Sequence, residues 1–136
     1  MGSYFEWDAN RFGLRIAAMD DEHKTLIGLM NKLHALHDAG AAGPALLAGL
    51  EDLARYTEKH FADEEAYMAK VGYAGAGAHK LVHERLLDRL GELHASCRAT
   101  HKLSEELFVF LKTWLSGHIC GMDAKYAAHA LARRAG

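Results

Sequence analysis

Seven side chains of the types that bind metal ions fall on the apolar stripes of expected helices in this sequence. Histidine and carboxylate side chains are normally kept out of a hydrophobic core unless they are paired or bind a metal ion. Their placement therefore indicates buried metal-binding chemistry. The seven residues are His23, His60, Glu64, His79, His83, His118 and Asp123.

The numbers and types of these side chains indicate which metal chemistry to expect. Five imidazoles and two carboxylates exceed the four ligands of one tetrahedral zinc ion. Imidazole suits iron, copper and zinc, and a carboxylate can bridge two ions. His60 and Glu64 lie about one helical turn apart, as do His79 and His83, so each pair shares a helix face. The set predicts two metal ions with bridging carboxylates.

Other polar side chains along the same helices are expected to have ordinary roles. A single buried histidine is as often structural as it is a ligand, so only the set of seven together indicates a metal site. Glu65 follows Glu64 but points about 100° away around the helix, and we expect it on the solvated face. His37 lies on an apolar stripe far from His23, which favours a structural role. The histidines expected to be solvated are His34, His94, His101 and His129.

Four amphipathic helices must bring the seven side chains together, because apolar residues recur at spacings of three and four. The helices are predicted over residues 20–39, 44–70, 78–98 and 104–119 or beyond, after an irregular N-terminal arm over residues 1–19. Such helices, joined by short loops, predict an all-α fold: an up-down-up-down antiparallel four-helix bundle in one domain over residues 1–136. In this bundle all seven side chains fall at one end.

Composition excludes several classes of protein. Of the 136 residues, 50% are hydrophobic, and the formal net charge is −2, which argues against disorder and against nucleic-acid binding. No apolar run approaches the roughly 18 residues of a transmembrane helix, so no membrane insertion is expected. The N-terminal residues lack the pattern of a secretory signal, and Cys97 and Cys120 form no motif. A cytoplasmic location is therefore expected.

Four stretches of the sequence resemble the hemerythrin family, and bacterial hemerythrins in particular, over nearly the whole chain. They are DDEHKTL at 20–26, HFADEEAYM at 60–68, YAGAGAHKLVH at 73–83 and WLSGHICGMDAKY at 114–126. The resemblance implies a non-haem di-iron centre that binds dioxygen reversibly.

The resemblance also implies a role for each residue that matches the family pattern. One iron would be held by His79, His83 and His118. The other would be held by His23 and His60 and would keep an open position. Glu64 and Asp123 would bridge the two irons, together with an oxide or hydroxide. The positions that surround the oxygen pocket in the family are matched by Leu26, Trp114, Leu115 and Ile119.

A protein of this family is expected to carry, store or deliver dioxygen and not to act as an enzyme. Two alternatives stay open at this point: a di-iron peroxidase or oxidase, and an oxygen or redox sensor that acts through a protein partner. Dioxygen is the expected ligand, an oxygen-consuming enzyme is a candidate partner, and a monomer is the expected state.

Overall fold

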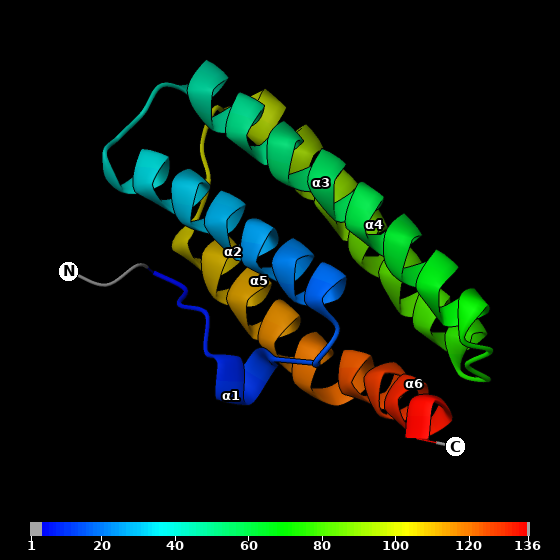
Figure 1. Cartoon of the computed structure of the whole chain (residues 1–136). Helices are drawn as coiled ribbons and strands as arrows, with labels where there is room; N and C mark the ends of the chain where they lie inside the picture. The colour runs from blue at the N-terminus through cyan, green and yellow to red at the C-terminus, as the bar shows by residue number, and fades with distance from the viewer. Residues whose placement is uncertain (1–3, 136) are drawn as a thin grey trace.

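Long amphipathic helices dominate the structure, a computed structural model that describes residues 4–135. The elements are α1 (Ala9–Phe12), α2 (Ala17–Asp38), α3 (Gly43–Lys70), α4 (Ala76–Thr100), α5 (Glu105–His118), the π-helical segment η1 (Ile119–Asp123) and α6 (Ala124–Ala135). Because α5, η1 and α6 follow one another without a break, they form the fourth long helix. Helices α3 and α4 pack as one antiparallel pair, and α2 lies antiparallel beside α5 (Figure 1). The predicted four-helix bundle is confirmed.

Local signals set where the helices begin and end. The Ser104 side chain caps α5 by accepting a hydrogen bond from the Leu107 N–H at 3.3 Å. Two glycines follow the ends of α2 and α3: Gly40 and Gly72 have φ values of 70° and 66°, in the left-handed region that glycine adopts without strain. These short turns keep consecutive helices antiparallel.

The N-terminal region is more regular than the predicted arm. Residues Ala9–Phe12 form α1, and α2 begins at Ala17 rather than at residue 20. A local contact accompanies the earlier start: the Asp20 carboxylate, in the first turn of α2, accepts a hydrogen bond from the Leu14 N–H at 2.9 Å. Asn31 on α2 also exchanges two hydrogen bonds with the backbone of Phe5, at 2.7 and 2.8 Å.

A single apolar core runs along the bundle axis between the four long helices. Its buried members include Leu33 on α2, Leu50 on α3, Leu90 on α4 and Leu111 on α5. Among the described residues, no helix is long and apolar enough to span a bilayer. The polar exceptions to the apolar core are concentrated at the end where α2 begins and α5 ends, which is where the candidate site lies.

Candidate metal centre

The seven side chains singled out in the sequence gather at one end of the bundle. All are buried, and none is more than 5% exposed. Each long helix contributes at least one of them: His23 on α2, His60 and Glu64 on α3, His79 and His83 on α4, and His118 with Asp123 on the fourth helix. The antiparallel arrangement causes this convergence, because the start of α2 lies beside the end of α3.

The side chains form two overlapping groups of possible ligands. The larger group comprises Glu64, His79, His83, His118 and Asp123, whose ligand atoms lie within 4.8 Å of one another. The smaller group, by the same measure, comprises His23, His60 and Glu64. Glu64 belongs to both groups. Asp123 also faces both, with Oδ1 3.0 Å from His79 Nε2 and Oδ2 3.0 Å from His23 Nε2. Two shared carboxylates between two sets of imidazoles suit a pair of ions.

The spacing of the imidazole nitrogens in the larger group fits a common ion. His118 Nε2 lies 3.0 Å from His79 Nε2 and 3.2 Å from His83 Nε2. For metal–nitrogen bonds of about 2.1 Å, two ligand atoms at a right angle are about 3.0 Å apart. A ring nitrogen has one hydrogen or one lone pair, so His118 Nε2 cannot form good hydrogen bonds with both neighbouring imidazoles, whereas one cation could be bound by all three.

Unpaired polar atoms at the centre of the cluster point to the same conclusion. His23 Nδ1 and Nε2, Glu64 Oε1 and both Asp123 oxygens are buried without a hydrogen bond of acceptable geometry, although ring nitrogens and carboxylate oxygens approach within 3.0–3.5 Å. An unpaired buried polar group is costly. A cation held among these atoms would remove that cost, so the residues present fit a metal centre.

The electrostatics of the cluster favour carboxylates that stay ionised. Burial raises the pKa of Asp123, as does the nearby Glu64, but the surrounding imidazoles of His118, His23 and His79 outweigh both effects and lower it to about 2. The same balance holds for Glu64. Burial alone would raise the pKa of Glu64, but contacts with four imidazoles outweigh burial and hold the pKa well below its usual range. Both side chains therefore present negative oxygen atoms at neutral pH.

Carboxylates behind the imidazoles hold two of the rings in place. His60 Nδ1 donates to Glu22 Oε1 at 2.6 Å, and His83 Nδ1 donates to Glu65 Oε2 at 3.0 Å. In both rings Nε2 is thereby directed to the centre, the arrangement expected of metal-bound histidine. The expectation that Glu65 would lie on a solvated face is wrong: its side chain is 27% exposed and reaches across to α4.

Tyr126 is a further contact that sequence reasoning missed. Its hydroxyl donates to Glu64 Oε2 at 2.9 Å, and its side chain is fully buried on α6. Burial and the charges of Glu64 and Asp123 raise the pKa of Tyr126, so the phenol keeps its proton. The signal was present in the sequence, since Tyr126 lies three residues after Asp123 on the same helical face.

Aromatic rings also orient the histidines. The Phe61 ring stacks on the His83 ring at 3.7 Å between centroids, and the Trp114 indole stacks on the His118 ring at 4.5 Å. Stacking fixes the ring planes of His83 and His118. In His83 the hydrogen bond at Nδ1 also fixes how the ring is turned within that plane. The His83 ring of α4 is thus held by two residues of α3, and the His118 ring is held by a residue of its own helix, α5.

The π-helical segment η1 explains how His118 and Asp123 share one face. Residues five apart on an α-helix would point about 140° away from each other. In η1 the Ala124 N–H donates to the Ile119 carbonyl, the five-residue pattern of a π-helix. One extra residue per turn brings both side chains to the cluster, with Asp123 Oδ1 3.1 Å from His118 Nε2.

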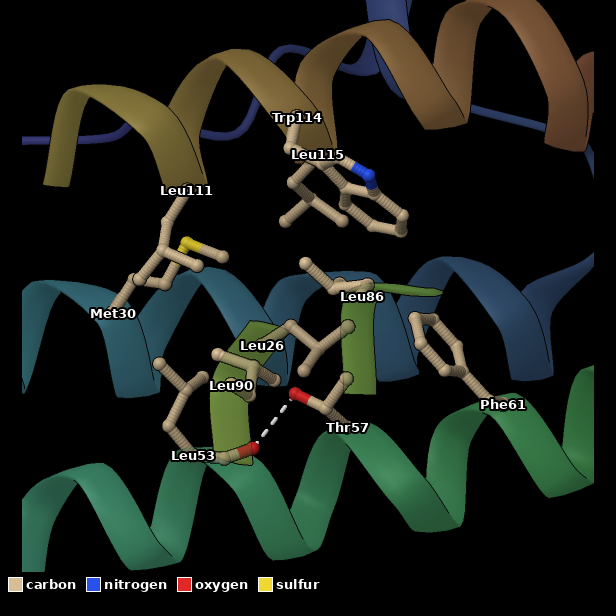
Figure 2. Close-up of a pocket in the computed structure, with 10 residues that line it drawn as sticks. All are labelled: Leu26, Met30, Leu53, Thr57, Phe61, Leu86, Leu90, Leu111, Trp114 and Leu115. Carbon is tan, nitrogen blue, oxygen red and sulfur yellow. Dashed lines mark hydrogen bonds between the residues drawn. The ribbon is translucent and has the colours of Figure 1, made fainter. Parts of the chain in front are cut away.

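An apolar cavity adjoins the cluster on the core side. Its walls come from all four long helices: Leu26, Met30, Leu53, Thr57, Phe61, Leu86, Leu90, Leu111, Trp114 and Leu115 (Figure 2). The Thr57 hydroxyl donates to the Leu53 carbonyl at 2.7 Å, which removes its polarity from the space (Figure 2). The room open to the centre of a water molecule is about 10 Å³, roughly the space of one small molecule.

The four residues expected around an oxygen pocket are not all placed alike. Leu26, Trp114 and Leu115 line the cavity, whereas Ile119 is buried in η1 and is not part of the cavity wall. Phe61 lines the cavity as well as stacking on His83. The cavity wall and the supports of the imidazole rings are therefore partly the same residues.

Three of the four histidines that were expected to be solvated have partners. His94 Nε2 donates to Glu51 Oε1 at 3.0 Å, and His129 Nε2 donates to the Val71 carbonyl at 2.9 Å. His34 lies under the Tyr4 ring and is only 13% exposed. For these residues the expectation is wrong, because the fold brings groups from distant parts of the chain to them that the sequence does not reveal.

Known proteins resemble this chain in both sequence and structure. The model of the family described as Hemerythrin HHE cation binding domain matches residues 14–130. A bacteriohemerythrin from Methylococcus capsulatus is 35% identical over 88% of this chain and 92% of that protein. A myohemerythrin from Riftia pachyptila is 33% identical over 91% of this chain and 92% of that protein.

Among solved structures, a wild-type hemerythrin superposes with a TM-score of 0.88 at 31% identity and covers 94% of this chain and 98% of that one. The match extends over the residues that carry the buried cluster, and the matched family is described as cation-binding. The chain therefore belongs to the hemerythrin family.

Proposed function

We propose that this protein binds dioxygen reversibly at a non-haem di-iron centre held by the seven buried side chains. The single observation that carries the proposal is the pair of overlapping ligand groups joined by Glu64. One group offers three imidazoles and the other offers two, so the two ions would differ in the number of protein ligands. The less coordinated ion, beside His23 and His60, would keep a position free for a ligand.

The ligand assignment is part of the proposal. His79, His83 and His118 would hold the coordinatively full iron, His23 and His60 would hold the other, and Glu64 and Asp123 would bridge the two with an oxide or hydroxide. When bound, the di-iron centre supplies the open coordination position and the electrons that reversible dioxygen binding needs. Glu22, Glu65 and Tyr126 keep the His60, His83 and Glu64 side chains oriented from behind.

The cavity supports binding of a very small apolar molecule. Its wall is built almost entirely of hydrocarbon, so water gains no hydrogen bonds by entering. Leu26 on α2 contributes to this wall, and it shares a helix face with His23, three residues earlier. We propose that Leu26 and its neighbours limit the entry of water and protons to the less coordinated ion.

The size of the cavity favours a carrier or store of dioxygen over an enzyme that acts on an organic substrate. With about 10 Å³ open to the centre of a water molecule, the cavity has room for about one small molecule. We propose that the protein carries, stores or delivers dioxygen. An oxygen-consuming enzyme as a partner and a monomer in solution stay predictions.

The test is an oxygen-binding cycle with iron counting. Protein from iron-sufficient cells should contain two irons per chain by elemental analysis. After anaerobic reduction, addition of air should produce an absorption band that argon removes and air restores. One zinc per chain, or a band that never reverses, would contradict the proposal. Steady consumption of added peroxide would instead favour the enzyme.

A further inference from the structure

A second cluster of metal-ligand side chains lies far from the buried centre, at the corner where α2 ends and α5 begins. Its members are His34 and His37 on α2, Asp38 at the end of α2, and Glu105 at the start of α5. His34 lies 11 residues after His23, about 16 Å along the helix, so the two clusters share no ligand. The hemerythrin-like residues described above do not include any of these four.

The Glu105 carboxylate faces both imidazoles of this cluster. Its Oε1 lies 3.4 Å from His37 Nε2, and its Oε2 lies 3.6 Å from His34 Nε2. Distances of this kind are too long for good hydrogen bonds. They are close to the separation of about 3.3 Å between ligand atoms around a tetrahedral ion with bonds of about 2.0 Å. The Glu105 carboxylate therefore lies between two imidazoles without a good hydrogen bond to either, within reach of a position where all three side chains could bind one ion.

Packing holds the first imidazole in the orientation that a ligand needs. The His34 ring stacks on the Tyr4 ring at 3.9 Å with an angle of 17°, and it meets the Phe108 ring edge-on at 4.8 Å. Asp38 Oδ2 lies 3.6 Å from the far nitrogen, Nδ1, of His34. With Asp38 at Nδ1, the other nitrogen, Nε2, is left facing Glu105. Carboxylate, imidazole and ion follow in this order at metal sites, and Asp38, whose side chain is 61% exposed, would have to move closer to His34 Nδ1 to form the hydrogen bond.

The second imidazole is freer to adjust. The His37 ring is tilted against Phe108 at 5.2 Å, and its side chain is 22% exposed. The His34 and His37 ring centroids are 6.4 Å apart, so a shared ion would require the His37 ring to turn toward His34. Glu105 is 59% exposed and can turn one oxygen into the space between the rings. The Glu105 side of the cluster is thus exposed to solvent, which would supply a water ligand.

From this geometry we propose that His34, His37 and Glu105 form a second metal site, for a borderline divalent cation of the zinc and copper class. Two imidazoles and one carboxylate are a ligand set that suits such ions, with a fourth position left for water. The ion would tie the end of α2 to the start of α5, under the N-terminal segment that carries Tyr4. The site is independent of the di-iron centre and of the function proposed for it.

Zinc binding to the iron-loaded protein, produced without an affinity tag, tests the site. Zinc would be titrated against a chromophoric chelator, with iron content and the di-iron absorption followed in the same sample. We expect one zinc ion per chain in addition to the irons, with the di-iron absorption unchanged. Glu105→Gln and His37→Gln should each weaken this binding at least tenfold.

Two matched variants serve as controls. His94→Gln removes another histidine that pairs with a carboxylate, Glu51, but has no second imidazole beside it. Glu106→Gln removes the neighbouring exposed carboxylate of α5. Both should bind zinc as the unaltered protein does. Zinc should also raise the melting temperature of the unaltered protein and leave that of Glu105→Gln unchanged, a readout that does not depend on the chelator.

Three results would overturn the proposal. The first is the absence of any added zinc, and the second is zinc uptake matched by loss of iron, which would place the zinc in the buried centre. The third is equal zinc affinity in Glu105→Gln, His37→Gln and the two controls. Because Glu105 is an exposed side chain, its replacement by glutamine keeps the fold, so a loss of zinc in that variant reports on the site itself.

Discussion

Two adjacent glutamates show how position on a helix separates similar residues into different roles. Glu64 is fully buried and has carboxylate oxygens 3.0–3.5 Å from His23, His60, His79 and His83. Glu65 points to a different side of α3 and meets only the far nitrogen of His83 within the cluster. In the proposed centre the first would contact the ions directly, and the second would orient a ligand.

Glu64→Ala should therefore remove most of the bound iron, whereas Glu65→Ala should keep the iron but bind it about 10–100-fold more weakly. Loss of the central carboxylate leaves two cations without their shared negative charge. Iron per chain after gel filtration, followed by competition with a chelator, measures both effects. Far-UV circular dichroism checks that the variants remain helical. Equal iron retention in the two variants would refute the bridging assignment of Glu64.

Leu26 is the residue at which stability and oxygen retention can be separated. Leu26→Ala should speed the decay of the oxygenated absorption band, because water would gain space beside the proposed less coordinated ion. It should also cost about 2–5 kcal/mol of unfolding free energy if the new space stays open. Leu33→Ala is a matched control: Leu33 is equally buried on α2 but does not line the cavity.

The comparison requires equal iron content and separate melting curves. Leu33→Ala should lose stability to a similar degree and keep the decay rate of the unaltered protein. If Leu26→Ala and Leu33→Ala decay alike, then Leu26 is ordinary core, and the open position does not lie beside α2.

At the scale of elements, the π-helical segment is the least regular and most consequential part of the fourth helix. The five-residue spacing of His118 and Asp123 requires the wider turn of η1, since an α-helix would send the two side chains to different faces. The same turn sets the direction of α6, and with it the position of Tyr126 beside Glu64.

Changing the length of η1 should reveal this requirement. Deleting Gly121, whose surroundings are open, leaves a four-residue spacing that an ordinary α-helix accommodates on one face. Inserting an alanine after Gly121 creates a six-residue spacing that neither helix type accommodates. The deletion variant should thus retain more iron than the insertion variant, at similar helical content. Equal iron loss in the two variants would contradict the view that η1 serves only to place His118 and Asp123 on one face.

At the scale of the whole molecule, the buried cluster links folding to pH. In the metal-free protein, burial lowers the pKa values of His23 and His79, but the neighbouring Asp123 and Glu64 carboxylates outweigh burial and raise both values to about 9. Histidine in an unfolded chain has a pKa of about 6.5. Folding therefore takes up protons, and this stabilisation is present below about pH 6.5 and is lost as the pH rises through about 9.

The metal-free protein should accordingly lose unfolding free energy between about pH 7 and 9.5, while the iron-loaded protein should lose much less, because bound imidazoles are already deprotonated. Urea unfolding at several pH values measures both slopes. His23→Gln should flatten the slope of the metal-free protein, and His94→Gln, which lies outside the cluster, should leave it unchanged. A metal-free slope of zero in this range would contradict the charge arrangement in the cluster.

Much of this protein follows from local sequence pattern. Apolar residues at spacings of three and four specified the long helices, and the predicted antiparallel bundle and the family resemblance are confirmed. The same pattern showed that histidines and carboxylates such as His60 and Glu64 lie on core-facing stripes. Helical periodicity is a property of consecutive residues, so the sequence alone reveals which side of a helix a residue occupies.

What the sequence could not decide is which partner each side chain meets on another helix. The pairing of Glu65 with His83, the contact of Tyr126 with Glu64 and the stacking of Tyr4 on His34 join residues far apart in the chain. These contacts depend on how far each helix is rotated and shifted against its neighbours, which the packing of the whole core sets. The sequence by itself determined the helices and the candidate ligands, and only the tertiary structure decided what orients those ligands and where the cavity lies.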